Sequence, residues 1–227
     1  MLNIIKRWFS PLEHRIDEAN SDELAVIWVH GANQSGLSFK YLRSLTRFKN
    51  ELVVEYDTSH KFKDNLEMLS NEILKVRGPY FMIGHSLGGL YALHLTKHLD
   101  VAGAVSISTP FAGSWTADWA RFFVPTYQLF RDVGRRSIPI KESQDIRLTV
   151  DWTQIVSTKG NVPYHGGLND GVCTIKSMRS RKDMELIEVP HTHFEVMCSD
   201  LVVEIILGRY QKVVRSKKKG NVIQKPF

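Results

Sequence analysis

The sequence predicts an α/β fold, in which helices cover both faces of a mostly parallel sheet and a helical insertion forms a cap. Short, nearly continuous hydrophobic runs alternate with longer amphipathic ones along the chain, as expected for strands that are buried on both faces. Residues 114–142 lie between two expected strands and are longer than a single connecting helix, so they are expected to be an insertion. With 43% hydrophobic and 24% charged residues, the 227-residue chain is expected to form one globular domain, and disordered and coiled-coil classes are excluded.

Each expected element rests on its hydrophobic pattern. Strands are expected where apolar residues run together without interruption, and helices where they recur every three or four positions. In chain order, the strands are expected at residues 24–29, 52–56, 80–83, 101–107, 149–156 and 185–189. The helices are expected at residues 39–47, 65–76, 87–99, 117–133 and 200–214, the last with Ser199 as its N-cap.

The positive charge is concentrated at the end of the chain. The net charge is +6, and residues 211–227 hold six basic residues and no acidic one, so residues 1–210 are balanced. A nucleic-acid-binding domain would spread the excess over a face of the fold. We therefore expect no nucleic-acid partner and a solvated basic tail, with weak contact to a membrane surface as the alternative.

Other features predict a cytoplasmic protein. No apolar run reaches the roughly 18 residues that a membrane-spanning helix needs. Residues 1–11 place their charges after apolar residues, which is not the pattern of a secretory signal. Cys173 and Cys198 form neither a disulfide framework nor a zinc motif, and no metal is expected.

A candidate nucleophile follows the third expected strand directly. Residues 84–89 read Gly-His-Ser-Leu-Gly-Gly and lead into an apolar helical run. A serine at a sharp strand-to-helix turn has strained backbone geometry, and side chains two residues before and after it would collide. Glycine at 84 and 88 removes that collision. The pattern therefore predicts that Ser86 is a nucleophile exposed at the carboxyl edge of the sheet.

Candidate oxyanion donors lie in two loops. The first strand runs into His30-Gly31-Ala32, a flexible segment upstream of the serine. We expect the backbone N–H groups of Ala32 and Leu87 to bind an oxyanion, the second at a helix N-terminus where the dipole favours negative charge. His30 lies at a strand end far upstream of the serine, and is expected to shape the loop.

Two histidines compete for the role of the base. His191 and His193 both follow the last expected strand, and we favour His193 because it lies at the far end of that loop. Asp170, in a glycine-rich loop, is the expected acid that orients the base. Asp57 precedes the serine, and Asp151 lies inside a strand, so both are less suitable.

With these residues, the chain resembles the α/β-hydrolase superfamily, and specifically its small serine lipases and esterases. Val-His-Gly-Ala at 29–32, the serine turn at 84–89 and Asn-Asp-Gly-Val at 169–172 are similar to the family's oxyanion, elbow and acid segments. Residues 108–114 are similar to a lipase segment, but Phe111 stands where that segment has histidine. His-Phe-Glu-Val at 193–196 resembles the family's closing histidine turn.

The resemblance implies a Ser86, His193 and Asp170 triad that cleaves carboxylic esters through an acyl-enzyme, with a small ester or lipid as substrate and no cofactor. Two alternatives stay open. A thioesterase or acyltransferase would use the same triad, and a non-catalytic binding protein can share this fold.

The expected cap is rich in aromatic residues. Trp115, Trp119 and Phe122 or Phe123 recur at spacings of three and four, which gives one aromatic face on a helix. We expect Trp119 and Phe123 to bind the acyl group of the substrate. The alternative is that these rings attach the cap to the body.

Overall fold

The computed structural model describes residues 24–123, 126, 128–163 and 167–223. It contains a six-stranded sheet in the order β2-β1-β3-β4-β5-β6, and every pair of neighbours is parallel. The predicted α/β class is therefore confirmed. The strands are β1 (Ala25–Val29), β2 (Glu51–Val54), β3 (Tyr80–His85), β4 (Val101–Ile107), β5 (Asp151–Ser157) and β6 (Glu185–Val189).

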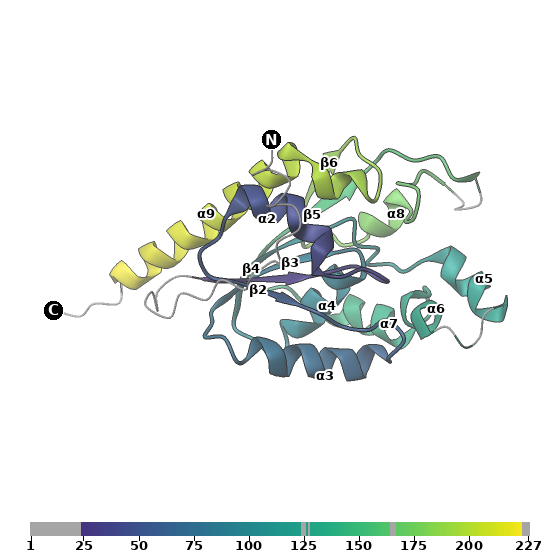
Figure 1. The fold of residues 1–227 in the computed structure, drawn as a ribbon, viewed down its shortest axis with the longest axis horizontal. Coiled ribbons are helices and arrows are strands. Elements are labelled where there is room, and N and C mark those ends of the chain that lie inside the picture. The colour runs from purple at the N-terminus through teal and green to yellow at the C-terminus, as the bar shows by residue number, and fades with distance from the viewer. Residues whose placement is uncertain (1–23, 124–125, 127, 164–166, 224–227) are drawn as a thin grey trace, which may run out of the picture.

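Helices cover both faces of the sheet, as Figure 1 shows. The α-helices are α2 (Lys40–Thr46), α3 (Phe62–Ile73), α4 (Leu87–Leu95), α5 (Trp115–Phe123), α6 (Gln128–Val133), α7 (Ile138–Asp145), α8 (Ile175–Met178) and α9 (Asp200–Ile223). Two 3₁₀ helices, η1 (Gly36–Phe39) and η3 (Glu195–Cys198), precede α2 and α9.

Alternation along β1 divides the core into two layers. Ile27 and Val29 pack in a cluster with residues of α3, α4 and α7, whereas Val26 and Trp28 pack with residues of α2 and α9. Successive side chains of a strand point to opposite faces. A central strand between two helical layers must therefore be apolar at every position, which explains the continuous hydrophobic run.

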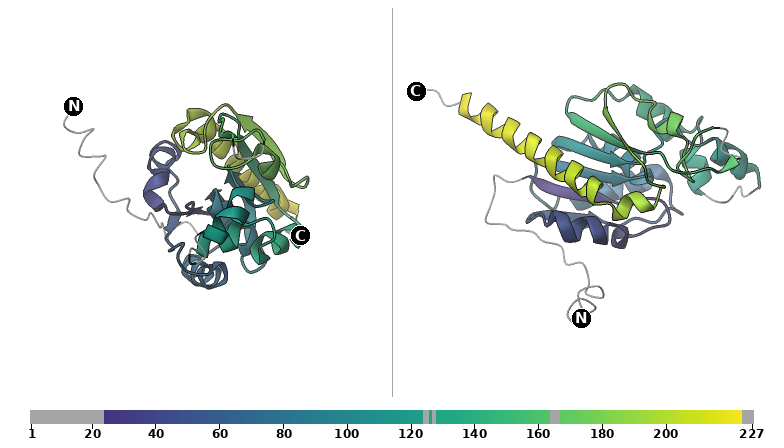
Figure 2. Two further views of the ribbon diagram at one scale, coloured as in Figure 1. Left: turned by 90° about the vertical axis from the view of Figure 1, so that its right-hand side faces the viewer. Right: turned by 90° about the horizontal axis from the view of Figure 1, so that it is seen from above.

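The expected helix over residues 117–133 is wrong, because α5 ends at Phe123 and α6 begins at Gln128. The sequence has proline at 125, and proline in a helix interior removes a backbone donor and clashes with the preceding turn. Helix α7 packs with the core through Ile140, and α6 packs against it through Leu129 and Val133. The part of the insertion that projects from the body is therefore α5 (Figure 2).

The last helix is longer than predicted. It was expected to end at residue 214, but α9 continues to Ile223, through most of the basic tail (Figure 1). Lysine and arginine are good helix formers, so a helix can continue without an apolar face to reveal it in the sequence. Residues 1–11, and the end of the tail from residue 224, lie outside the described residues.

In the part of the chain that the structure describes, no helix combines the length and the apolar character needed to cross a bilayer.

Candidate active site

Ser86 occupies a strained turn between β3 and α4. Its backbone has φ 51° and ψ −118°, a conformation that non-glycine residues rarely adopt. The Ser86 N–H donates to the carbonyl oxygen of Ile107 at 2.8 Å, which fixes the turn to the end of β4. The side chain is partly exposed at the carboxyl edge of the sheet.

The glycines on both sides of Ser86 are required by close packing. A Cβ at Gly84 would lie 2.5 Å from the backbone N of Gly89, and a Cβ at Gly88 would lie 1.9 Å from the carbonyl oxygen of Val29. Both distances are far inside van der Waals contact. The predicted steric role of these two glycines is therefore confirmed.

The same packing brings the two predicted oxyanion segments together. A Cβ at Gly88 would also lie 2.5 Å from the carbonyl oxygen of His30, so the start of α4 contacts the end of β1. Leu87 is the first residue of α4, where backbone N–H groups have no partner within the helix. Ala32 lies in the loop that β1 enters. The two predicted donors therefore lie on segments in direct contact.

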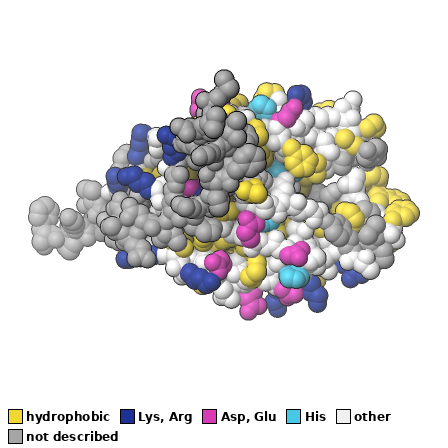
Figure 3. Space-filling view, viewed as in Figure 1, with side chains coloured by type: hydrophobic (Ala, Val, Ile, Leu, Met, Phe, Trp, Pro, Cys, Tyr) yellow, Lys and Arg dark blue, Asp and Glu magenta, His cyan; other side chains and the backbone are white. Residues whose placement is uncertain are grey.

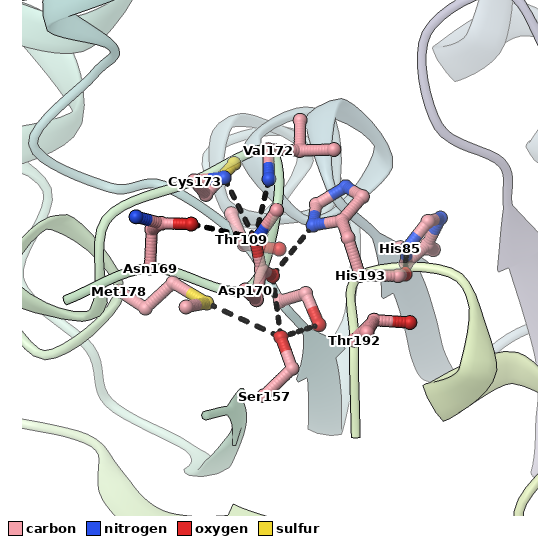
Figure 4. A network of polar contacts seen from close by, with 12 residues as sticks. His85, Thr109, Ser157, Asn169, Asp170, Val172, Cys173, Met178, Thr192 and His193 are labelled. Atoms are coloured by element: carbon pink, nitrogen blue, oxygen red, sulfur yellow. Dashed lines mark hydrogen bonds and ion pairs between the residues drawn. The ribbon is translucent and has the colours of Figure 1, made fainter. Parts of the chain in front are cut away.

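His193 and Asp170 are joined twice (Figure 4). His193 Nδ1 lies 2.7 Å from Asp170 Oδ2, and the His193 backbone N–H donates to the Asp170 carbonyl oxygen at 2.9 Å. Both side chains are almost fully buried. The double contact fixes the ring orientation and leaves Nε2 as the nitrogen that can exchange a proton with a substrate or a serine.

The Asp170 carboxylate accepts from three further donors. Oδ1 accepts from the backbone N–H groups of Val172 at 3.0 Å and Cys173 at 2.7 Å, and Oδ2 accepts from Ser157 Oγ at 2.5 Å. Burial raises the pKa of Asp170, but hydrogen bonds from His193, Ser157 and Cys173 outweigh burial and hold this pKa below its usual value. The carboxyl group is therefore ionised at neutral pH.

A chain of two serines supports the carboxylate. Ser108 Oγ lies 2.7 Å from Ser157 Oγ. Since Ser157 donates its proton to Asp170, the Ser157 oxygen accepts from Ser108. Ser108 has φ 53°, a strained value that points to a constrained position. Together these contacts connect the ends of β4 and β5 to residues 167–172, the acid loop, which carries Asp170.

His85 links the serine turn to residues 190–194, the histidine loop, which carries His193. Its Nε2 lies 3.0 Å from the His193 carbonyl oxygen, and the two rings are 4.9 Å apart. Complete burial, together with the nearby His193, lowers the pKa of His85 to about 3. Neutral His85 donates from Nε2 to that carbonyl oxygen. Because His85 directly precedes Ser86, this hydrogen bond holds the serine turn against the histidine loop.

The alternative candidates lie elsewhere. His191 Nε2 contacts Ser199 Oγ at 2.8 Å, so the serine expected to cap α9 contacts this histidine. His30 is buried and stacks on Tyr56, and its ring accepts from the Tyr56 N–H at 3.3 Å. Asp151 begins β5, at the sheet edge opposite to Ser86.

One cluster among the described residues has the composition of a metal site. Ligand atoms of Asp170, Cys173 and His193 lie within 4.8 Å of one another. However, both Asp170 oxygens already accept hydrogen bonds, and burial raises the pKa of the Cys173 thiol well above its usual value. A protonated thiol is a poor ligand, so the donor set does not fit a metal centre.

The cap leaves the predicted substrate-binding rings in solvent. Trp119 is 55% exposed and Phe123 is 80% exposed. The Trp119 ring packs edge to face against Trp115, with the centroids 6.0 Å apart. Since both predicted side chains are largely exposed, they retain apolar surface that a ligand could cover.

Three residues of the site were not predicted from the sequence as site residues. His85 occupies the variable position of the serine motif, and nothing in the sequence distinguishes it. Ser108 directly follows β4, and Ser157 is the last residue of β5. Polar residues at the carboxyl ends of parallel strands meet at one edge of the sheet, and this signal could have suggested both serines.

A parallel sheet with a strained serine elbow and a buried histidine–aspartate pair defines an α/β hydrolase. The sequence matches the model of the alpha/beta hydrolase family over residues 26–154. The chain belongs to this family, as its motifs had suggested. Comparison with curated proteins gives no match.

Solved structures share the fold at low sequence identity. The lipase BlEst2 of Bacillus licheniformis, in its mature form, has a TM-score of 0.69 and 18% identity, over 88% of this chain and 96% of the lipase. The metagenomic carboxyl esterase MGS0156 has a TM-score of 0.63 and 14% identity, over 92% of this chain and 80% of the esterase. The phospholipase PlaB of Legionella pneumophila has a TM-score of 0.63 and 12% identity, over 86% of this chain and 62% of that protein. These structures support the fold, and the family match supports a hydrolase.

The glycine packing predicts a large difference between two alanine substitutions. Gly88→Ala should lower the free energy of unfolding by about 1–3 kcal/mol or more, because the added Cβ meets backbone atoms that cannot move aside. The control is Gly208→Ala within α9, where an added Cβ meets nothing within 4 Å. This control should gain about 0.5–1 kcal/mol. Denaturant unfolding measures both changes, and an unchanged Gly88→Ala variant would contradict the packing.

The lowered pKa of His85 predicts a pH-dependent stability. Unfolded His85 has a pKa near 6.5 and folded His85 about 3, so the unfolded state binds more protons between these values. Stability from this residue is therefore present above 6.5 and is lost as the pH falls toward 3. His85→Gln, which keeps a donor, should remove that dependence.

We expect the wild type to lose more unfolding free energy than His85→Gln between about pH 7 and about pH 5, by at most roughly 1.4 kcal/mol per pH unit. Denaturant unfolding at both pH values measures the difference. Equal losses of unfolding free energy in the two proteins would show that the pKa of His85 is the same in the folded and unfolded states.

Proposed function

We propose that the protein is a serine hydrolase of carboxylic esters, with Ser86 as nucleophile, His193 as base and Asp170 as the orienting acid. The observation that carries the proposal is the contact of 2.7 Å between His193 Nδ1 and the ionised, four-fold hydrogen-bonded Asp170 carboxylate. A buried pair of this kind, beside a strained serine turn, is the arrangement that activates a hydroxyl group.

In the proposed first step, Ser86 Oγ attacks the ester carbonyl carbon while His193 Nε2 takes the hydroxyl proton. The carbonyl oxygen becomes an oxyanion, which accepts hydrogen bonds from the N–H groups of Ala32 and Leu87. When the tetrahedral intermediate collapses, the C–O bond of the ester breaks. His193 returns the proton to the leaving alcohol, and the acyl group stays on Ser86.

In the second step, water attacks the acyl-enzyme, and His193 takes a proton from the water. Collapse of the second intermediate returns this proton to Ser86 and releases the carboxylic acid. Asp170 keeps its negative charge throughout. It stabilises the imidazolium that forms twice in each cycle, and its lowered pKa suits this role.

The exposed cap rings are suited to the apolar part of such a substrate. Trp119 and Phe123 are both more than half exposed, and each methylene that they remove from water would contribute about 0.8 kcal/mol to binding. We propose that these rings contact the acyl group.

The two histidines of one loop offer a matched test of the mechanism. His193→Ala should lower kcat for a nitrophenyl ester on the order of 10³-fold or more, as Ser86→Ala should, because members of a triad act as one unit. His191→Ala should cost far less, because the hydrogen bond of the His191 ring is to Ser199, away from the Asp170 carboxylate.

Steady-state kinetics of the three variants, with circular dichroism to confirm folding, makes the comparison. A larger loss in His191→Ala than in His193→Ala would reassign the base. Substantial activity in Ser86→Ala would reject the nucleophile.

A further inference from the structure

A groove lies between the cap and α8, beside the acid loop. It has a volume of about 850 Å³, within the range of small-molecule sites. Its apolar lining comes from Trp115 at the start of α5, Leu168 in the acid loop and Ile175 in α8. The described lining residues include none of Ser86, Asp170 and His193. The groove is therefore separate from the residues proposed for ester cleavage.

Hydrogen bonds hold the walls of the groove in place. Ser177 Oγ accepts from the Ala112 N–H at 3.2 Å and donates to the Gly113 carbonyl oxygen at 2.7 Å. The Ile175 N–H donates to the Leu168 carbonyl oxygen at 2.9 Å. These contacts connect α8 to the segment after β4 and to the acid loop, so the groove is preformed and needs little reorganisation to bind a ligand.

Large apolar side chains in and beside the groove face solvent. Leu168 is 79% exposed and Trp115 is 38% exposed. Figure 3 shows hydrophobic side chains gathered at the end of the molecule that carries α5. An apolar ligand would remove this surface from water.

The charged lining of the groove is entirely cationic. Arg135, Lys176 and Arg179 line it, and no acidic residue does so among the described lining residues. Arg135 Nε donates to Asp118 at 2.7 Å, and Arg179 pairs with Glu188. A guanidinium has five N–H donors, so one ion pair leaves donors for a ligand. Lys176 adds an exposed ammonium on α8.

We propose that this groove binds a single-chain anionic amphiphile as a monomer, with its hydrocarbon chain on Trp115, Leu168 and Ile175 and its anionic group at Lys176 and Arg179. Apolar walls with cations, and no acid among them, are complementary to a ligand with both an alkyl chain and a negative charge. A concave groove encloses one chain, whereas a bilayer surface is broad. The proposal does not depend on the triad.

Calorimetric titration of the full-length protein tests the proposal with two probes. Decyl phosphate and decyl maltoside, both below their critical micelle concentrations, share the alkyl chain and differ in charge. We expect decyl phosphate to bind at least tenfold more tightly, and its affinity to fall as salt is added. Equal affinity for the two probes, or binding of anionic vesicles without binding of the monomer, would overturn the proposal.

Charge reversal locates the anionic group. Lys176→Glu should weaken binding of decyl phosphate at least fivefold. The matched control is Lys63→Glu, an exposed residue of α3 outside the groove lining, which should change the affinity less than twofold. Equal losses in the two variants would show a general effect of net charge and would overturn the assignment.

A separate variant distinguishes the groove from the ester site. Ser86→Ala should bind decyl phosphate as the wild type does, whether or not Ser86 is the nucleophile, because Ser86 does not line the groove. Loss of binding in Ser86→Ala would place the amphiphile at the serine and reject a separate site.

Discussion

The buried negative charge of Asp170 constrains the whole candidate site. An isolated carboxylate away from water is unfavourable by several kcal/mol, so a 0% exposed aspartate must be surrounded by donors. The chain supplies two N–H groups from the next turn of the acid loop, a hydroxyl from the end of β5 and the ring of His193. Each donor therefore has little freedom, and the histidine loop is fixed relative to the end of the sheet.

Steric contacts position the serine turn, whereas hydrogen bonds position the Asp170 carboxylate. Close backbone contacts at Gly84 and Gly88 exclude a side chain at both positions. His85 then connects this rigid turn to the histidine loop through the His193 carbonyl group. A neutral imidazole suits that position, because a positive charge on His85 would repel the imidazolium of His193 and weaken its stabilisation by Asp170.

Features that depend on neighbouring residues could be predicted from the sequence, whereas contacts between distant residues could not. The bounds of β4 and β6 were predicted exactly, and the glycines around Ser86 revealed the elbow, because both signals lie within a few residues. The Ser157 to Asp170 and His85 to His193 contacts depend on how strands and loops meet in space. Helix α9 was predicted too short, because lysine-rich sequence continues a helix without an apolar periodicity.

Active-site labelling with a fluorophosphonate tests most directly the central claim that these constraints activate Ser86. The reagent reacts with a serine whose proton is taken by an adjacent base. We therefore expect one adduct on the intact protein, and peptide mass spectrometry should locate it on Ser86. Denatured protein should not react. Labelling of another serine, or equal labelling of folded and denatured protein, would contradict the account.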